Sequence, residues 1–222
     1  MTKAHRFKRL LIGLFITINL GCTQQKKEII KPNILFILSE DMSIDLECYG
    51  MPGVKTPVLN QLASTGIQYM NAYGNNSICS PSRSNMMTGV HQNIINAQHH
   101  RSNRNIPLAA PYKPITSYLR DAGYTCIIGD KTIGGGGKID VNFKHKKLGE
   151  WDGVNEFGLF DKQNEFNVED QPFFSQVTLT VTHRGGHWDN VSKLSKHKVN
   201  PKDVVLPPHY ADTPVIREDW GK

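Results

Sequence analysis

Two short stretches of this chain carry side chains that could do chemistry together. Glu40 and Asp41 are adjacent carboxylates, which repel each other unless a cation lies between them, and their hard oxygens suit Ca²⁺ or Mg²⁺. The second stretch, from Cys79 to Arg83, is Cys-Ser-Pro-Ser-Arg. Pro81 fits the first turn of a helix, so Cys79 would precede a helix N-terminus, where free backbone N–H groups favour a sulfate or phosphate oxyanion. The simpler alternatives are a solvated turn and a buried structural cysteine.

Predicted strands would bring further reactive side chains to the same place. Three apolar runs have the pattern of strands in a parallel sheet, and the first is typical of a strand buried on both faces. Open α/β sheets place their ligands beyond the carboxyl ends of the strands. The first expected strand, 33–38, is followed by Glu40 and Asp41. The second, 124–128, is followed by Lys131 and Lys138, and the third, 173–181, by His183.

Helices are expected between these strands. Thr56 should cap a helix that begins at Pro57 and ends at Gly66, and two more are expected over 84–87 and 114–122. The alternation predicts an α/β fold with a mixed, mostly parallel sheet and helices on both faces. A further short strand is expected over 67–73, a loop that is either solvated or faces a substrate over 91–105, and extended surface chain over 201–214.

The charge of the chain is concentrated at its N-terminus. The net charge is +6, and residues 1–31 account for all of it, so the body is neutral and does not favour nucleic acid. A basic start and an apolar run too short to span a bilayer comfortably are followed by Leu-Gly-Cys22, which resembles a bacterial lipoprotein cleavage site. We expect an exported, periplasmic or lipid-anchored protein, with plain secretion or an uncleaved anchor as alternatives. The expected parts are a signal at 1–22, a linker at 23–31 and a body at 32–222.

The stretches 32–41 and 79–89 resemble the opening strand and the modified-cysteine helix of type I sulfatases, a branch of the alkaline phosphatase superfamily. The likeness runs from about Pro32 onward and is closest to bacterial heparan N-sulfatase-like members. In that family a formylglycine-generating enzyme oxidises the cysteine of Cys-x-Pro-Ser-Arg to an aldehyde. The resemblance therefore implies such a partner enzyme and a formylglycine at Cys79.

The resemblance also implies a role for each candidate. Glu40, Asp41 and the modified Cys79 would bind Ca²⁺, in preference to Mg²⁺. Arg83 would hold the aldehyde hydrate, and His183 would touch the sulfate. If Cys22 is acylated and Cys79 oxidised, two cysteines are left, Cys48 and Cys126, and the sequence does not decide whether they pair.

Two departures from the family pattern concern the lysine and the length. The family's Gly-Lys-x-His is replaced by competing segments around Lys138 and Lys131, neither of which supplies the histidine, and Lys138 is favoured. The glycine-rich loop before Lys138 lacks the spacing of a nucleotide-binding P-loop. Type I sulfatases are also longer, and we expect a truncated member whose Ca²⁺ site lacks oxygens and whose sheet exposes an edge. Asp189 and Asn190 are not expected to replace the missing ligands.

The function implied is that of a sulfatase that cleaves an O-sulfate or N-sulfate from a sulfated carbohydrate, with activity that the truncation would impair. One alternative is a phosphoesterase of the same superfamily, although a cysteine at the nucleophile position argues against it. Another is a non-catalytic lipoprotein that binds sulfated glycans through Arg83, Lys138 and His183. The chemical state of Cys79 separates these hypotheses, because binding alone needs no aldehyde.

Overall fold

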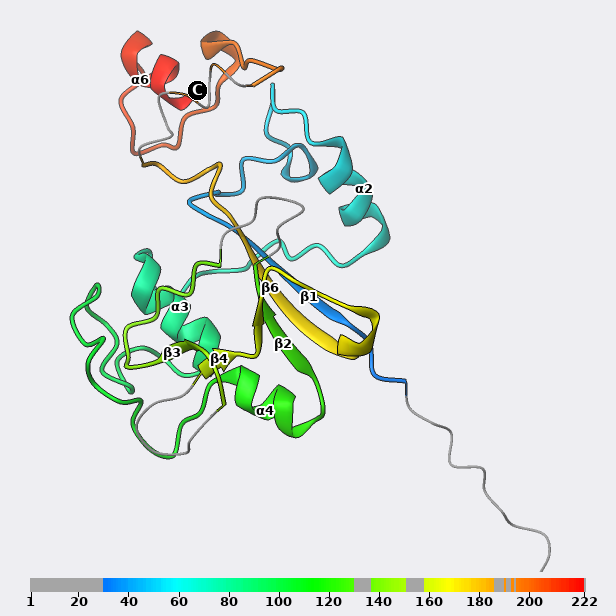
Figure 1. The fold of residues 1–222 in the computed structure, drawn as a ribbon. Helices are drawn as coiled ribbons and strands as arrows, with labels where there is room; N and C mark the ends of the chain where they lie inside the picture. Colours follow the sequence, from blue (N-terminus) through cyan, green and yellow to red (C-terminus); the bar gives the residue numbers. More distant parts are fainter. Residues whose placement is uncertain are drawn as a thin grey trace, which may run out of the picture. The chain divides into compact units, whose positions relative to one another are not determined.

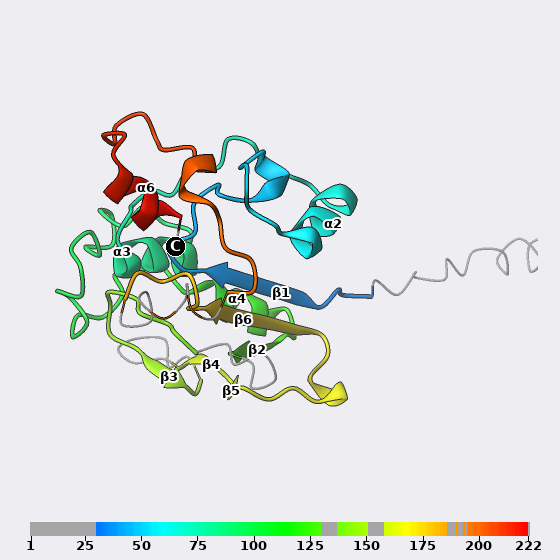
Figure 2. The same ribbon diagram turned by 90° about the horizontal axis from the view of Figure 1, so that it is seen from above.

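A four-stranded parallel sheet forms the centre of the fold (Figure 1). Seen from above, the strands lie in the order β1-β6-β2-β5 (Figure 2). The strands are β1 (Ile34–Ser39), β6 (Phe173–Leu179), β2 (Thr125–Ile128) and β5 (Lys162–Gln163). The register pairs Ile34 with Phe174, and Cys126 pairs with the same Phe174 from the other side. The α/β class with a parallel sheet is therefore confirmed.

This computed structural model describes residues 30–129, 137–150, 158–185, 190, 193 and 195–221. Residues Pro32–Lys222 form one compact unit by their contacts. A second, two-stranded parallel sheet consists of β3 (Lys146–Leu148) and β4 (Gly158–Phe160). The sequence did not predict β3, β4 or β5, because strands of two or three residues show no usable alternation of apolar and polar side chains.

The core lies where one helix packs against β2 and β4 and a second helix packs against the first. These helices are α4 (Ile115–Asp121) and α3 (Cys79–Thr88), respectively. Gly89 ends α3 in the left-handed conformation with φ of 66°, and its N–H donates to the carbonyl of Asn85, a common helix C-cap. The helices expected near residues 84 and 114 are thus present, and α3 starts earlier than predicted. The core side chains are Met87, Ile95, Ala97, Leu108, Cys126, Ile128, Ile139, Val141, Phe143, Leu159, Phe160 and Phe174.

The first strand is not buried on both faces, so that prediction was wrong. Leu35 is 56% and Ile37 is 52% exposed, because β1 is an edge strand that pairs with β6 alone among the described residues. Helix α2 (Pro57–Thr65) is present as predicted, but Val58 and Leu62 on its apolar side are 77% and 63% exposed. An apolar run predicts the conformation of a strand and cannot reveal which neighbours cover it.

Other local predictions also need correction. Residues 67–73 form no strand. Thr56 stands at the N-cap of α2, but its side chain makes no capping bond. A helix that the sequence did not predict, α6 (Pro214–Trp220), begins in the stretch expected to be extended. The short 3₁₀ helices are η1 (Glu47–Tyr49), η2 (Val168–Asp170) and η3 (Pro201–Asp203).

Two further findings concern membranes and cysteines. Among the described residues, every helix is too short or too polar to cross a bilayer. Cys48 and Cys126 are free thiols and do not form a disulfide with each other. Cys22 lies outside the described residues.

Candidate active site

The carboxyl ends of β1 and β6 place the acid pair and the histidine side by side. The N–H of Glu40 donates to the carbonyl of Leu179 at 3.0 Å, so the pairing of the two strands continues one residue beyond β1. His183 follows β6 after a short turn, in which its N–H donates to the carbonyl of Thr180. The Glu40 side chain is 4% exposed, whereas that of Asp41 is 45% exposed. The strand ends therefore offer one buried and one accessible carboxylate.

Four predicted site residues converge on one point. Ligand atoms of Glu40, Asp41, Cys79 and His183 all lie within 4.8 Å of one another. His183 Nε2 is 3.9 Å from an oxygen of each carboxylate, and Cys79 Sγ is 4.0 Å from Glu40 Oε2. Cys79 is the first residue of α3, with Ile78 at the N-cap, so the thiol lies in the first turn and not ahead of the helix as predicted.

Two cationic side chains bind the buried carboxylate of Glu40. Lys138 Nζ lies 2.8 Å from Glu40 Oε2, and Arg83 Nη2 donates to Oε1. Arg83 Nη1 also donates to the carbonyl of Lys138 at 2.9 Å, which ties the two cationic segments together. Burial acts to raise the pKa of Glu40, but the hydrogen bonds and charges of Lys138 and Arg83 outweigh it and hold that pKa below its usual range. The structure thus brings Lys138 into the site; the alternative, Lys131, lies outside the described residues.

The two carboxylates suit a hard cation but do not complete its coordination shell. Carboxylate oxygens are the ligands that Ca²⁺ and Mg²⁺ prefer, and Ca²⁺ takes about six to eight oxygens. Glu40 and Asp41 supply fewer than that. Each also has another partner, because Glu40 accepts from two cations and Asp41 Oδ2 accepts the N–H of Arg184 at 3.0 Å. A cation bound here would compete with Lys138 and Arg83 for Glu40, and other oxygens would have to complete its shell.

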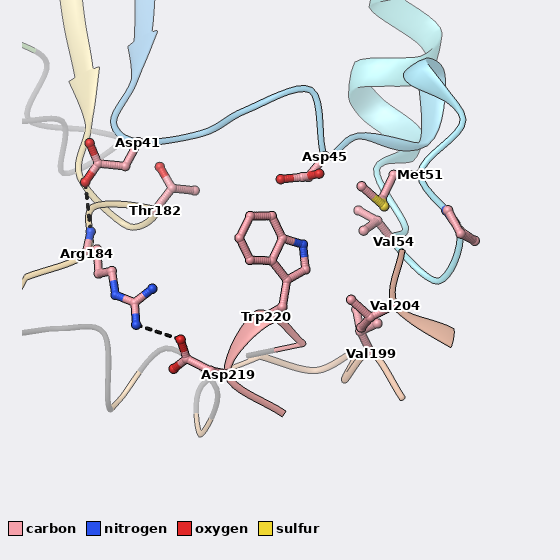
Figure 3. Close-up of a pocket in the computed structure, with 11 residues that line it drawn as sticks. Asp41, Asp45, Met51, Val54, Thr182, Arg184, Val199, Val204, Asp219 and Trp220 are labelled. Atoms are coloured by element: carbon pink, nitrogen blue, oxygen red, sulfur yellow. Dashed lines mark hydrogen bonds and ion pairs between the residues drawn. The ribbon is translucent and has the colours of Figure 1, made fainter. Parts of the chain in front are cut away.

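A pocket of about 320 Å³ opens beside the acid pair (Figure 3). Asp41 and Thr182 line it, so it adjoins the site directly. Figure 3 shows the indole of Trp220 projecting into the middle of the pocket. Arg184 lines it too and pairs with Asp219 at 2.6 Å. The rest of the lining is Asp45, Met51, Pro52, Val54, Val199 and Val204.

Sequence reasoning missed two parts of this site. Trp220 lies on α6, although Thr213-Pro214 is the same helix-start signal that was recognised at Thr56-Pro57. Asp140 lies 3.9 Å from Lys138 Nζ and binds Arg101 and Arg104 from the loop 91–105. The loop 91–105 contains two arginines and no acidic residue, and this imbalance was the sequence signal that an acid elsewhere would pair with them. Asp189 lies outside the described residues.

Comparisons with known proteins agree on one family. The family model described as Sulfatase matches residues 32–212. An ulvan-active sulfatase of Formosa agariphila is 33% identical over 166 residues, which make up 70% of this chain and 26% of that protein. Human N-sulphoglucosamine sulphohydrolase is 26% identical over 84% of this chain and 42% of its own length.

A solved structure shows the same fold. A Bacteroides thetaiotaomicron protein described as a sulfatase superposes with a TM-score of 0.52 at 19% identity, covering 82% of this chain and 42% of that one. The chain thus spans between about a quarter and two-fifths of the length of the curated relatives named here.

Proposed function

Because the chain belongs to the sulfatase family, we propose that Glu40, Asp41, Cys79 and His183, with Arg83 and Lys138, form the site of a hydrolase that releases sulfate from sulfated sugars. The observation that carries the proposal is the convergence of acid pair, cysteine and histidine within 4.8 Å, beside two cations. These residues come from four segments that are far apart in sequence.

The charges explain how the site would stabilise a sulfuryl group in transfer. Negative charge spreads over the sulfuryl oxygens in the transition state, and fixed cations aimed at those oxygens lower its energy. Lys138 and Arg83 both bind Glu40, and Arg83 also donates to the carbonyl of Lys138, so the two cations are already positioned next to Cys79. His183 is 38% exposed and can reach a substrate oxygen or the leaving sugar hydroxyl.

The nucleophile would be Cys79 after oxidation to formylglycine by a formylglycine-generating enzyme. Its hydrate offers one hydroxyl to attack sulfur and a second whose deprotonation expels the sulfate. Glu40, Asp41 and the modified Cys79 would hold Ca²⁺, which supplies positive charge for the sulfuryl oxygens and lowers the pKa of the attacking hydroxyl.

The adjoining pocket supports a sugar as the rest of the substrate. An indole face and several carboxylates are the groups that bind the apolar faces and hydroxyls of a pyranose ring. Trp220, Asp45 and Asp219 provide them next to Asp41. The names of the relatives point the same way, since one is an N-sulphoglucosamine sulphohydrolase and another, from Bacteroides thetaiotaomicron and 32% identical, is an N-acetylgalactosamine-6-O-sulfatase.

Mass spectrometry of the Cys79 peptide, from a host that matures its other sulfatases, is the first test. An aldehyde or its hydrate, with Ca²⁺-dependent sulfate release from N-sulfoglucosamine or a 6-O-sulfated hexosamine, is the expected result. Cys79→Ala should abolish that release, whereas Lys55→Ala on the surface should not. An unmodified thiol in such a host would overturn the catalytic proposal. It would favour a non-catalytic protein that binds sulfated glycans, because binding needs no aldehyde.

The N-terminal segment supports a separate proposal on location. We propose export across a bacterial inner membrane and anchoring by a lipid on Cys22. The basic start, the apolar run and the Leu-Gly-Cys22 sequence support it. Partition of the expressed protein into detergent, lost in Cys22→Ala, is expected; a water-soluble product with an intact N-terminus would contradict it.

A further inference from the structure

We propose that Arg101 and Arg104, held by Asp140, form a second anion-binding subsite that takes a further sulfate or carboxylate of a polyanionic sugar. The inference rests on the proposed function, since it assigns the second anionic group of the same substrate. It predicts that the preferred sugar carries more than the one sulfate that is cleaved.

The subsite is built around one buried carboxylate. Arg101 Nε and Nη2 donate to the two oxygens of Asp140 at 3.1 and 2.9 Å, and Arg104 Nη2 donates to Oδ1. The Asp140 side chain is 5% exposed, whereas Arg101 and Arg104 are 48% and 43% exposed. One carboxylate thus fixes two guanidinium groups that face solvent, and the three side chains carry a net positive charge.

Two links connect this trio to the candidate active site. The N–H of Arg101 donates to Ser80 Oγ at 2.9 Å, and Ser80 is the neighbour of Cys79 in the first turn of α3. On the other side Asp140 Oδ2 lies 3.9 Å from the same Lys138 Nζ that binds Glu40. The trio is therefore connected on two sides to the residues around Cys79, where a sulfate would be cleaved.

Backbone conformation gives an independent reason to assign a function. Arg101 has φ of 56° and Asp140 has φ of 49°, values that residues other than glycine rarely adopt. Such conformations cost free energy and cluster at ligand-binding and catalytic sites. Asp41 at the acid pair shares the feature, with φ of 48°. An ion pair that only fastened a loop would not need both of its partners in this conformation.

The arginines also keep donors for a ligand. Asp140 accepts three hydrogen bonds from them, and within the described part of the chain Arg101 Nη1 and Arg104 Nε and Nη1 make no hydrogen bond. Guanidinium forks match the oxygens of sulfate and carboxylate, and their hydrogen bonds to anions are stronger than neutral ones.

The test measures the affinity of the whole chain for three probes by calorimetry at low salt. The probes are glucosamine with one sulfate, glucosamine with two sulfates, and a monosulfated disaccharide that contains a uronic acid. We expect the disulfated sugar or the uronic acid probe to bind at least about tenfold more tightly than the monosulfated one. If the disulfated sugar binds more tightly, the second anion is a sulfate. If the uronic acid probe does, the second anion is a carboxylate.

Variants then assign the gain to the trio. Arg104→Gln should remove most of the gain and leave the affinity for the monosulfated sugar unchanged, and Arg101→Lys should weaken it because lysine cannot form the fork. Lys55→Gln, which removes one positive charge from a surface ion pair elsewhere, should change nothing. Equal affinities of wild type for all probes, or equal losses in Arg104→Gln and Lys55→Gln, would overturn this inference alone. Failure of every probe to bind would overturn the proposed function with it.

Discussion

The pairing of Glu40 with Lys138 can be measured without any assay of activity. A double-mutant cycle of Glu40→Gln and Lys138→Met gives the coupling free energy of the pair, since effects of each side chain with its other neighbours cancel. The surface pair Glu47 and Lys55 serves as the matched control, with the same charges and the same substitutions.

Burial and distance predict different coupling in the two pairs. Glu40 is 4% and Lys138 is 22% exposed, and their charged atoms are 2.8 Å apart. A hydrogen bond to a charged group in such a setting contributes about 1.5–3 kcal/mol, so we expect a coupling near 2 kcal/mol. In the control pair Lys55 is 66% exposed and the atoms are 3.5 Å apart, so solvent screening should reduce the coupling to within experimental error.

Urea unfolding at neutral pH, followed by circular dichroism, provides the four free energies of each cycle. The m-values should agree among the variants, which shows that the same surface is exposed on unfolding. A coupling below about 0.5 kcal/mol for Glu40 and Lys138, or one no larger than that of the control, would refute the reasoning that burial strengthens this pair.

Three further predictions follow from other parts of the structure. Burial raises the pKa of Cys126 to about 12, so alkylation at pH 8 followed by mass spectrometry should label Cys48 far faster than Cys126. Equal labelling rates of the two thiols would contradict the burial of Cys126. Burial acts to raise the pKa of Asp140, but the hydrogen bond and charge of Arg101, with the charges of Arg104 and Lys138, together outweigh it and the pKa is lowered, so Asp140→Asn should be less stable at pH 7. The deficit should shrink as the pH falls below about 4, the ordinary pKa of an aspartate in the unfolded chain, and continue to shrink down through the lowered pKa of native Asp140; a deficit independent of pH would contradict the ion pair. Ile37→Lys on the exposed edge strand should reduce self-association in light scattering and change stability by less than about 1 kcal/mol, whereas a collapse of the fold would show that the strand is covered.

The sequence predicted the segments that carry strong local signals. An apolar run ending in Glu40-Asp41 and a cysteine before a proline at the start of a helix both have patterns that fix local conformation. Because all four strands are parallel, their carboxyl ends meet at one edge, and this topology brings Glu40 and His183 together. The sequence could therefore predict which residues gather at the site, although it could not predict the distances between them.

What the sequence could not predict depends on neighbours far along the chain. The run at β1 has the composition of a central strand, yet Leu35 and Ile37 are exposed because the strand lies at the sheet edge. The strands β3, β4 and β5 are too short to show a period. The pairing of Asp140 with Arg101 joins positions 39 residues apart, and no local pattern encodes such a contact.

The balance of charge shows why the second subsite matters for selectivity. Glu40 and Asp41 together cancel the charges of Lys138 and Arg83, so these four side chains alone exert little net attraction on a sulfate at a distance. Binding there depends on short, directed contacts, and a divalent cation between the carboxylates would add the missing positive charge. Arg101 and Arg104 exceed the charge of Asp140 by one and are exposed. A sugar with a second anionic group would therefore gain attraction at the trio that a monosulfated sugar lacks, while the chemistry stays with the residues around Cys79.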